Sequence, residues 1–305
     1  MEQFNKNEFT KEFTDSKDDY SSYINELVKE LKNDKDVYNS LESLKLTVKE
    51  VKNNIAKLID YKEDFNFCKN CPGLKKCNKN NPLTQMSLRK EGSYINIDFT
   101  PCKEAVKQMQ IDSNYIIDDF PQEWKNNLFD KLDLDTNRNR RLVIKQFKDC
   151  LNGSNRWIYL FGNKRVGKSY LLVTLANEFI NLGYGKVGVV SFPKLVSSLM
   201  DYFYQDKETF NKQFDMLINA PLLIIDDFGD EYKSEYIRDT ITIPLINERA
   251  SKNKLTFFGS EFTMKEVASM YNLSKTNGSI RSRQLLTNLQ GMCKEEFDLS
   301  GTVVY

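Results

Sequence analysis

The sequence predicts an α/β fold in which helices flank a mostly parallel sheet, preceded by a smaller helical unit that carries a group of cysteines. Three observations support this prediction. An apolar run leads through a glycine-containing loop into a helix at residues 157–180, strands and helices alternate after it, and a periodic, cysteine-containing region precedes it. We expect a frayed N-terminus over residues 1–20, a first domain over 21–110, a linker over 111–135 and the α/β domain over 136–305.

Composition narrows the class of protein. With 29% charged and 40% hydrophobic residues, and no apolar run near the ~18 residues of a membrane span, we expect no membrane association and a cytoplasmic location. The net charge of +1 means that any affinity for nucleic acid must come from a local patch. Histidine is absent, which excludes His-dependent acid/base catalysis and His metal ligands.

Apolar residues recur at three- and four-residue intervals in the first domain, with Lys and Glu between them. No heptad is sustained, so the pattern predicts two or three short amphipathic helices and no long coiled coil. Periodicity leaves open whether these helices pack on one another or offer a face to a partner. The apolar positions are Tyr23, Leu27, Leu31, Leu41, Leu44, Leu46, Val48, Val51, Ile55, Leu58 and Ile59.

Four cysteines follow these helices. Cys68 and Cys71 form a CxxC pair, Cys77 comes five residues later, and Cys102 follows a stretch that alternates like a strand after Gly92. In a reducing compartment four thiolates so spaced favour a closed zinc site, with Cys102 returned to the CxxC pair by a hairpin. The alternative is a set of incidental thiols.

The segment 157–170, WIYLFGNKRVGKSY, has the strand, loop and helix order of a phosphate-binding loop. Gly162 and Gly167 let backbone N–H groups close around phosphate oxygens, Lys168 is expected to reach the β- and γ-phosphates of ATP, and Ser169 to bind Mg²⁺. The expected nucleotide-binding residues are Gly162, Asn163, Lys164, Arg165, Val166, Gly167, Lys168, Ser169, Tyr170 and, from the strand discussed next, Asp226.

A buried strand over 221–225 ends in two aspartates, which is the pattern of a Walker B segment. Asp226 is then expected near the magnesium ion, and Asp227 where it orients or deprotonates the attacking water. Solvated turn residues are the alternative. Further strands are expected at 186–191 and 255–258 and in the terminal 301–305, whereas we interpret the apolar run at 115–121 as no strand. Pro244 should kink the helix over 237–249 or start a new segment there.

These features together resemble one family over nearly the whole chain: the bacterial replicative helicase loaders of the DnaI/DnaC type within the AAA+ ATPases, and the DnaI branch in particular. The marks are the helices before the cysteines, the hairpin returning to Pro101-Cys102, the phosphate-binding loop, the strand from Leu222 to Gly229, Arg238-Asp239, and Thr256-Phe257-Phe258-x-Ser260.

The resemblance implies an AAA+ core without a helical lid, which binds ATP, Mg²⁺ and single-stranded DNA. It also implies an N-terminal zinc-binding module that binds the hexameric replicative DNA helicase, and a primosomal role in delivering that helicase to DNA during replication initiation. A homo-oligomer on the helicase ring is a further expectation.

Three positions depart from the family pattern. Arg165 replaces a small residue of the phosphate-binding loop, and Glu261 takes the place of an asparagine that helps to position water. The family has an arginine pair that acts on a neighbour's nucleotide; here Arg281 or Arg283 is the candidate, and the second arginine of the pair is missing. Loss of a trans-acting arginine slows turnover greatly, so we expect nucleotide binding with slow or partner-dependent hydrolysis. As catalytic candidates we name Asp227, Lys168, Glu261, Arg281 and Arg283.

Two other functions fit parts of the pattern. A transposition-accessory AAA+ ATPase shares the lidless core and its nucleotide motifs, but the cysteine module argues against it. The other is a degenerate loader, which binds its partner through the N-terminal module and hydrolyses little ATP.

Overall fold

The computed structural model describes residues 17–132, 137–273 and 277–301. Its contacts divide the chain into two compact units, residues 1–109 and 110–305. Each unit has a hydrophobic core of its own. Among the described residues, no helix has the length and apolar character needed to cross a membrane.

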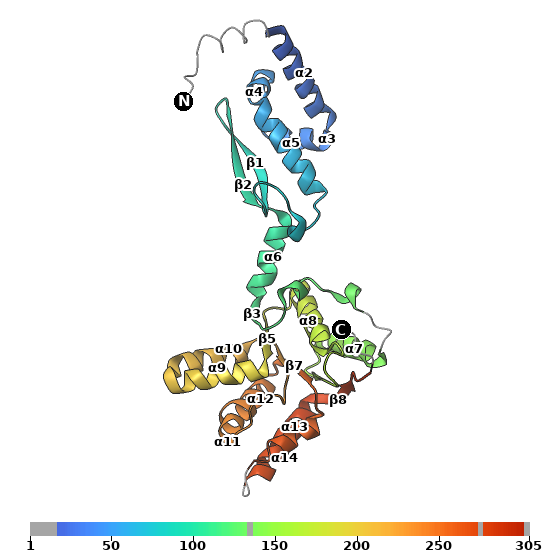
Figure 1. The fold of residues 1–305 in the computed structure, drawn as a ribbon, viewed down its shortest axis with the longest axis vertical. Coiled ribbons are helices and arrows are strands. Elements are labelled where there is room, and N and C mark those ends of the chain that lie inside the picture. Colours follow the sequence, from blue (N-terminus) through green and yellow to red (C-terminus); the bar gives the residue numbers. More distant parts are fainter. Residues whose placement is uncertain (1–16, 133–136, 274–276, 302–305) are drawn as a thin grey trace, which may run out of the picture. The chain divides into compact units, whose positions relative to one another are not determined.

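The first unit is a set of helices packed against a two-stranded hairpin (Figure 1). Strands β1 and β2 are antiparallel and join through a two-residue turn, where Gly92 has a φ of 63°, in the left-handed region that glycine tolerates. The hairpin that we predicted is therefore confirmed. The elements are α2 (Lys17–Asn33), α3 (Lys35–Glu42), α4 (Val48–Asn53), α5 (Ile55–Lys69), the 3₁₀ turn η1 (Leu74–Lys76), β1 (Thr84–Glu91), β2 (Tyr94–Pro101) and α6 (Lys103–Asn114), which runs on into the second unit.

Helices α2, α3 and α5 bury apolar side chains in the core of the first unit, whereas α4 has no fully buried residue and packs against this core through Val51. Val37, Leu58 and Ile95 are completely buried at the centre of this core. Within residues 17–69, four helices lie where two or three were predicted, and the last of them contains Cys68. On α2, Ile24 and Leu31 are buried and Tyr23 is exposed, and the predicted apolar position Val48 on α4 is exposed as well. The helices thus pack on one another and on the hairpin.

The second unit is built on a six-stranded sheet with the order β3-β5-β6-β7-β4-β8, and every pairing between its neighbouring strands is parallel. This confirms the α/β architecture. The elements are β3 (Tyr115–Asp118), η2 (Gln122–Trp124), η3 (Phe129–Lys131), α7 (Arg138–Leu151), β4 (Trp157–Phe161), α8 (Lys168–Asn181), β5 (Val187–Ser191), α9 (Phe192–Gln205), α10 (Lys207–Asn219), β6 (Leu222–Asp226), α11 (Glu235–Ile237), η4 (Arg238–Thr242), α12 (Ile243–Ser251), β7 (Leu255–Ser260), α13 (Met264–Met270), α14 (Gly278–Met292) and β8 (Cys293–Asp298).

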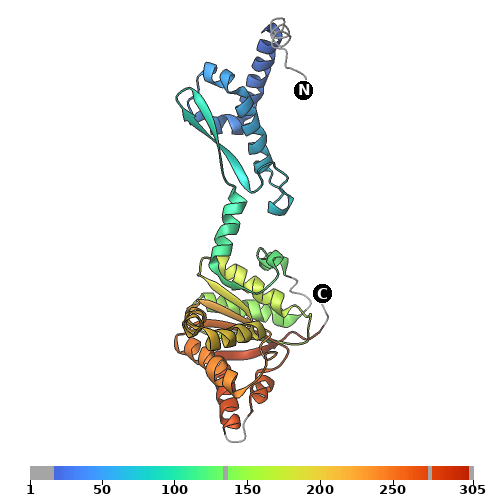
Figure 2. The same ribbon diagram turned by 60° about the vertical axis from the view of Figure 1, so that its left-hand side comes forward.

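Helices cover both faces of this sheet, and the two views in Figures 1 and 2 agree on it. Strand β4 shows why: Trp157 and Tyr159 pack into the core beneath α9, α10 and α12–α14, whereas Ile158 and Leu160 pack into the opposite core with α7 and α8. All four side chains are completely buried. A central parallel strand is apolar on both sides for this reason, so β4 and β6 are continuous apolar runs in the sequence.

Both edges of the sheet differ from the prediction. The run at 115–121, interpreted as no strand, contains β3, which pairs with β5. Residues 115–118 of the segment expected as a linker are therefore a strand of the second unit. The opposite edge is β8, which no pattern in the sequence predicted. Of the strand expected at 301–305, residues 302–305 lie outside the described residues, and Gly301 is a bend.

The helix that contains Pro244 is interrupted as predicted. A π-helical turn, η4, separates the short helix α11 from α12, and Pro244 lies in the first turn of α12. Proline has no N–H to donate into the preceding turn, so the hydrogen-bond pattern shifts there.

Candidate functional site

The phosphate-binding loop lies between β4 and α8, at the carboxyl ends of the parallel strands. Gly162 has a φ of 142° and a Cβ there would lie 2.8 Å from the backbone nitrogen of Ser300, so only glycine fits. Gly167 has a φ of 87° and caps the N-terminus of α8. The local geometry that the sequence predicts is therefore present.

Lys168 is buried and turned back onto its own loop. Its Nζ donates to the backbone oxygens of Gly162, at 2.7 Å, and Asn163, at 2.9 Å. Burial lowers the pKa of Lys168, against the opposing effect of nearby carboxylates led by Asp226. The lysine that is expected to contact the phosphates is thus hydrogen-bonded to backbone oxygens of its own loop.

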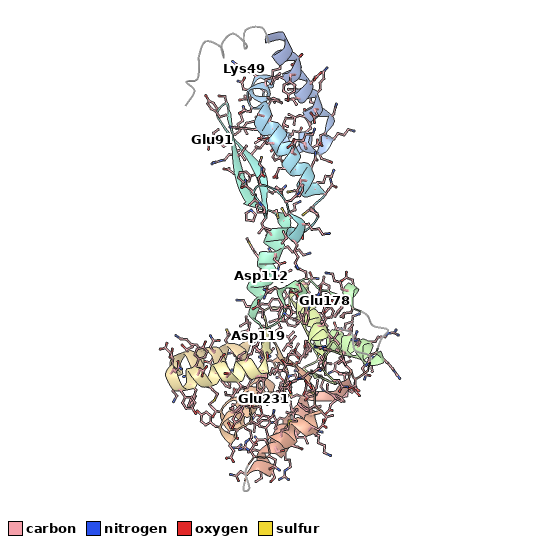
Figure 3. All side chains as sticks on the ribbon, in the orientation of Figure 1. Lys49, Glu91, Asp112, Asp119, Glu178 and Glu231 are labelled. Atoms are coloured by element: carbon pink, nitrogen blue, oxygen red, sulfur yellow. The ribbon has the colours of Figure 1, made fainter. Side chains whose placement is uncertain are left out.

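The other residues of the loop divide into exposed and packed ones. Asn163, Lys164 and Arg165 are exposed, whereas Val166 is buried in the core and its backbone oxygen accepts a hydrogen bond from Arg140, at 2.9 Å. Tyr170 packs edge-on against the ring of Trp124, with 5.4 Å between ring centroids. The carboxylate of Glu178, on the same helix as Tyr170, accepts a hydrogen bond from the backbone of Phe129 (Figure 3).

Asp226 ends β6 beside the start of α8. Its carboxylate is hydrogen-bonded to Ser169, and burial raises the pKa of Asp226. Its Oδ1 is buried and has no hydrogen-bond partner within the described part of the chain. A Cβ at Gly259 on β7 would lie 2.1 Å from this oxygen, so glycine leaves the space that the carboxylate occupies. A hydroxyl and an unpaired carboxylate oxygen are the donors that Mg²⁺ prefers, so these residues fit the ion.

Asp227 has left the strand geometry. Its φ is 55°, and its Oδ2 accepts a hydrogen bond from the Ser191 hydroxyl, at 3.2 Å. The backbone N–H of Ser191 in turn donates to Asp119, which follows β3 (Figure 3). Three strand ends are linked through these side chains.

The loop after Asp227 is fixed by a buried carboxylate. Glu231 (Figure 3) accepts hydrogen bonds from the backbone of Gly229, at 2.8 Å, and from the hydroxyl of Tyr271, which also bonds to Thr242 in the π turn. No sequence pattern predicted this network. The turn residue Gly229, at a φ of 103°, was its one local signal.

Glu261 follows β7 and pairs with Lys164, whose Nζ is 3.0 Å from Oε1 of Glu261. Lys164 and Glu261 are both among the predicted site residues, but the pattern did not predict that they pair. The hydroxyl of Ser260 donates to the backbone oxygen of Phe228 and accepts from the backbone of Phe262.

Arg281 and Arg283 are both exposed on α14. Arg281 bonds to Gln284, at 3.0 Å, and its Nε is 3.5 Å from Oδ1 of Asp239. Arg238 forms an ion pair with the same carboxylate and also donates to the backbone oxygen of Tyr271. The action of either α14 arginine on a neighbour's nucleotide stays a prediction.

The four cysteines Cys68, Cys71, Cys77 and Cys102 line one cavity of about 330 Å³ in the first unit. Donors point at three of the sulfurs. The Nζ of Lys79 is 3.3 Å from Cys68, the backbone of Ala105 donates to Cys102, and backbone N–H groups led by that of Leu83 lower the pKa of the Cys77 thiol.

Lining the same cavity does not by itself place the four cysteines close enough together to bind a metal ion. Over residues 17–132, 137–273 and 277–301, no three Cys, Asp or Glu side chains are grouped so as to hold a metal ion. The structure thus brings the predicted ligands to one place without forming a zinc site.

Comparison with known proteins gives a consistent picture. No protein-family model matches the chain. It is 24% identical over 271 residues to the replicative helicase loader DnaI of Bacillus subtilis (strain 168), which covers 84% of this chain and 85% of that protein.

Two solved structures share the fold. A crystal structure of DnaI matches with a TM-score of 0.54 and 25% identity, over 61% of this chain and 97% of that one. A candidate primosome component from Streptococcus pyogenes serotype M3 matches with a TM-score of 0.52 and 20% identity, over 65% and 100% of the respective chains. The chain is therefore similar in sequence and fold to a DnaI-type replicative helicase loader, and its second unit has the AAA+ ATPase architecture.

Proposed function

We propose that this protein is a primosomal loader of the hexameric replicative DNA helicase, which it delivers to single-stranded DNA in the cytoplasm during replication initiation. The observation that carries the proposal is a phosphate-binding loop facing Asp226, in a chain whose similarity to DnaI extends over 84% of its length. That share exceeds the second unit alone, so the similarity includes part of the first unit.

The second unit binds ATP. The loop from Gly162 to Ser169 surrounds the phosphates, and the carbonyls that now hold Lys168 release it to them. Ser169 and the unpaired oxygen of Asp226 would hold Mg²⁺, and the ion would supply positive charge against the phosphates. Asp227 orients the attacking water once Ser191 releases its carboxylate.

Hydrolysis is slow or dependent on a partner. Arg281 is paired with Asp239 on its own chain, so it is not free to serve the reaction in an isolated chain. A neighbouring copy on the helicase ring would bring Arg281 or Arg283 to the nucleotide of the next copy.

The first unit binds the helicase, and its four clustered cysteines bind zinc after a small rearrangement of side chains. Four thiolates suit zinc, and the N–H groups aimed at the sulfurs are the outer hydrogen bonds that stabilise such sites. Metal analysis of the purified full chain is expected to find one zinc per chain. Cys102→Ser should lose it while Cys293→Ser, remote in sequence, keeps it; equal zinc in both variants would refute the site.

The loader function is tested by light scattering on size-exclusion fractions of the full chain mixed with the replicative helicase of the same organism, with and without ATP and Mg²⁺. We expect a stable complex. A chain that starts at Lys103, so that α6 stays whole, should form none. If the full chain forms no complex under either condition, the loader proposal fails and the transposition-accessory function becomes the better proposal.

The role of the nucleotide is tested separately by Lys168→Ala. Loss of a charge-assisted contact should weaken ATP binding about 10- to 100-fold. Helicase delivery that continues unchanged in this variant would identify a degenerate loader, in which nucleotide chemistry is dispensable.

A further inference from the structure

The ion pair between Lys164 and Glu261 joins the phosphate-binding loop to the strand end beside it. Lys164 is the third residue of the loop, and Glu261 directly follows β7, the strand that neighbours β4 in the sheet. The Lys164 side chain is 75% exposed and that of Glu261 27% exposed, so the pair lies at the rim of the site. Surface pairs of this kind contribute little to stability, so a bracing role explains it poorly.

The pair belongs to a larger arrangement of charges. The carboxylate of Glu261, followed by those of Asp230 and Asp227, raises the pKa of Lys164, and Lys168 is influenced by the same three groups and by Asp226. Two lysines of the loop are therefore under the electrostatic influence of four carboxylates, and one of these carboxylates, Glu261, is paired with Lys164. Without a nucleotide, the charges of Lys164 and Lys168 therefore interact with carboxylates of the protein itself.

A nucleotide changes this balance according to its length. The loop surrounds the phosphates, so a triphosphate brings more negative charge to the lysines than a diphosphate does. Glu261 and an added phosphate cannot share Lys164 without repelling each other. Binding of a triphosphate must therefore compete with Glu261 for this lysine.

We propose that Lys164 is a specificity-determining residue that distinguishes ATP from ADP: Glu261 holds it in the absence of the terminal phosphate, and the terminal phosphate takes it over. This inference rests on the proposed nucleotide-binding function. It follows that Glu261 is released only in the triphosphate state. Glu261 lies two residues before Thr263, the N-cap of helix α13.

The test is calorimetric titration of the full chain with ADP and with the non-hydrolysable ATP analogue adenylyl imidodiphosphate, both with Mg²⁺. Lys164→Ala should weaken binding of the analogue about fivefold and leave ADP nearly unchanged. Glu261→Gln should strengthen binding of the analogue by a similar factor. The matched controls are Lys212→Ala and Glu208→Gln, which break an exposed pair on α10 and should change neither affinity.

The double variant Lys164→Ala/Glu261→Gln separates two mechanisms. If Lys164 contacts the terminal phosphate, the double variant binds the analogue more weakly than Glu261→Gln alone. Equal binding of these two variants would mean that Lys164 only screens Glu261, and would overturn the inference. If the substitutions change the affinities for ADP and for the analogue equally, the inference is overturned as well, because such a result indicates that the ion pair only stabilises the loop. A wild-type chain that binds neither nucleotide refutes the nucleotide-binding proposal itself, which is a distinguishable result.

Discussion

Gly259 has a role that only its position explains. It lies on β7 opposite the carboxylate that ends β6, and its missing side chain leaves the space for Oδ1 of Asp226. The oxygen proposed to meet Mg²⁺ is therefore placed by a neighbouring strand. No sequence motif names this glycine, because its partner lies on a different strand.

Gly259→Ala is expected to weaken the binding of magnesium nucleotide. The new methyl group must displace the Asp226 carboxylate, which costs at least about tenfold in affinity, the value of one charge-assisted contact. Titration with a fluorescent ATP analogue measures the effect. Gly291→Ala is the matched control, since a Cβ there meets no atom within 4 Å; the same affinity in both variants would contradict the prediction.

Arg249 is a charged residue that stabilises the fold. It is completely buried, and its guanidinium donates to the backbone oxygens of Leu217, Ile218 and Ala220 at the end of α10 and to Leu255 and Thr256 on β7. Burial lowers the pKa of Arg249 to about 9. The arginine ties a helix end to the sheet.

Arg249→Met should reduce the free energy of unfolding by about 3 kcal/mol, because it leaves several buried carbonyl groups without donors. The midpoint of urea denaturation reports the loss. Arg283→Met, at an exposed position on α14, should change stability by no more than about 0.5 kcal/mol. An Arg249 variant as stable as this control would show that water or other donors replace the guanidinium.

At the scale of the element, helix α4 depends on a capping box. The Thr47 hydroxyl accepts from the backbone of Glu50, and the Glu50 carboxylate accepts from the backbone of Thr47, at 2.8 Å, while also pairing with Lys90 of the hairpin. These contacts lower the pKa of Glu50 to about 2, with the backbone hydrogen bond from Thr47 as the largest cause. The ionised carboxylate is thus favoured in the folded state.

A pH dependence follows from this pKa. The stabilisation is fully present above the ordinary value of 4.5 and is lost as the pH falls toward about 2. Glu50→Gln should therefore lower the melting temperature at pH 7, and the difference from wild type should shrink at pH 4 and again at pH 3. A difference that stays constant over this range would assign the effect to packing instead.

The elements that could be predicted from the sequence are those that are buried on both sides or flanked by clear turns. β4, β6 and β7 are apolar runs, and the loop after β4 carries its own motif. β8 was hidden because only Cys293, Phe297 and the partly buried Glu296 turn inward at the sheet edge, while its other residues are exposed and mostly charged. β3 was hidden because a four-residue edge strand is recognised only by its partner β5.

Within the candidate site, the sequence identified single candidate residues but did not predict which of them pair. Lys164 was predicted because it lies in the phosphate-binding motif, and Glu261 because it follows a predicted strand. Their contact depends on β7 lying beside β4 in the sheet, which the sequence did not predict. The same holds for Asp227 and Ser191, which end neighbouring strands. Likewise, the cysteine spacing predicted a common location without the ligand geometry.

At the scale of the whole molecule, two compact units with separate cores predict two unfolding transitions. Magnesium ATP should raise the midpoint of one transition only, because ligand binding stabilises the unit that holds it. A zinc chelator should lower the other. Scanning calorimetry of the full chain tests both. One transition that shifts with both treatments would show that the units unfold as one.

The junction of α6 and β3 has a mechanical meaning. The helix ends at Asn114 and the strand begins at Tyr115, so no loop residue takes up slack between them. Tension applied to α6 is loaded directly onto the hydrogen bonds that hold β3 against β5. Because hydrogen bonds link Asp119 to Ser191 and Ser191 to Asp227, such a pull would also reach the proposed nucleotide site.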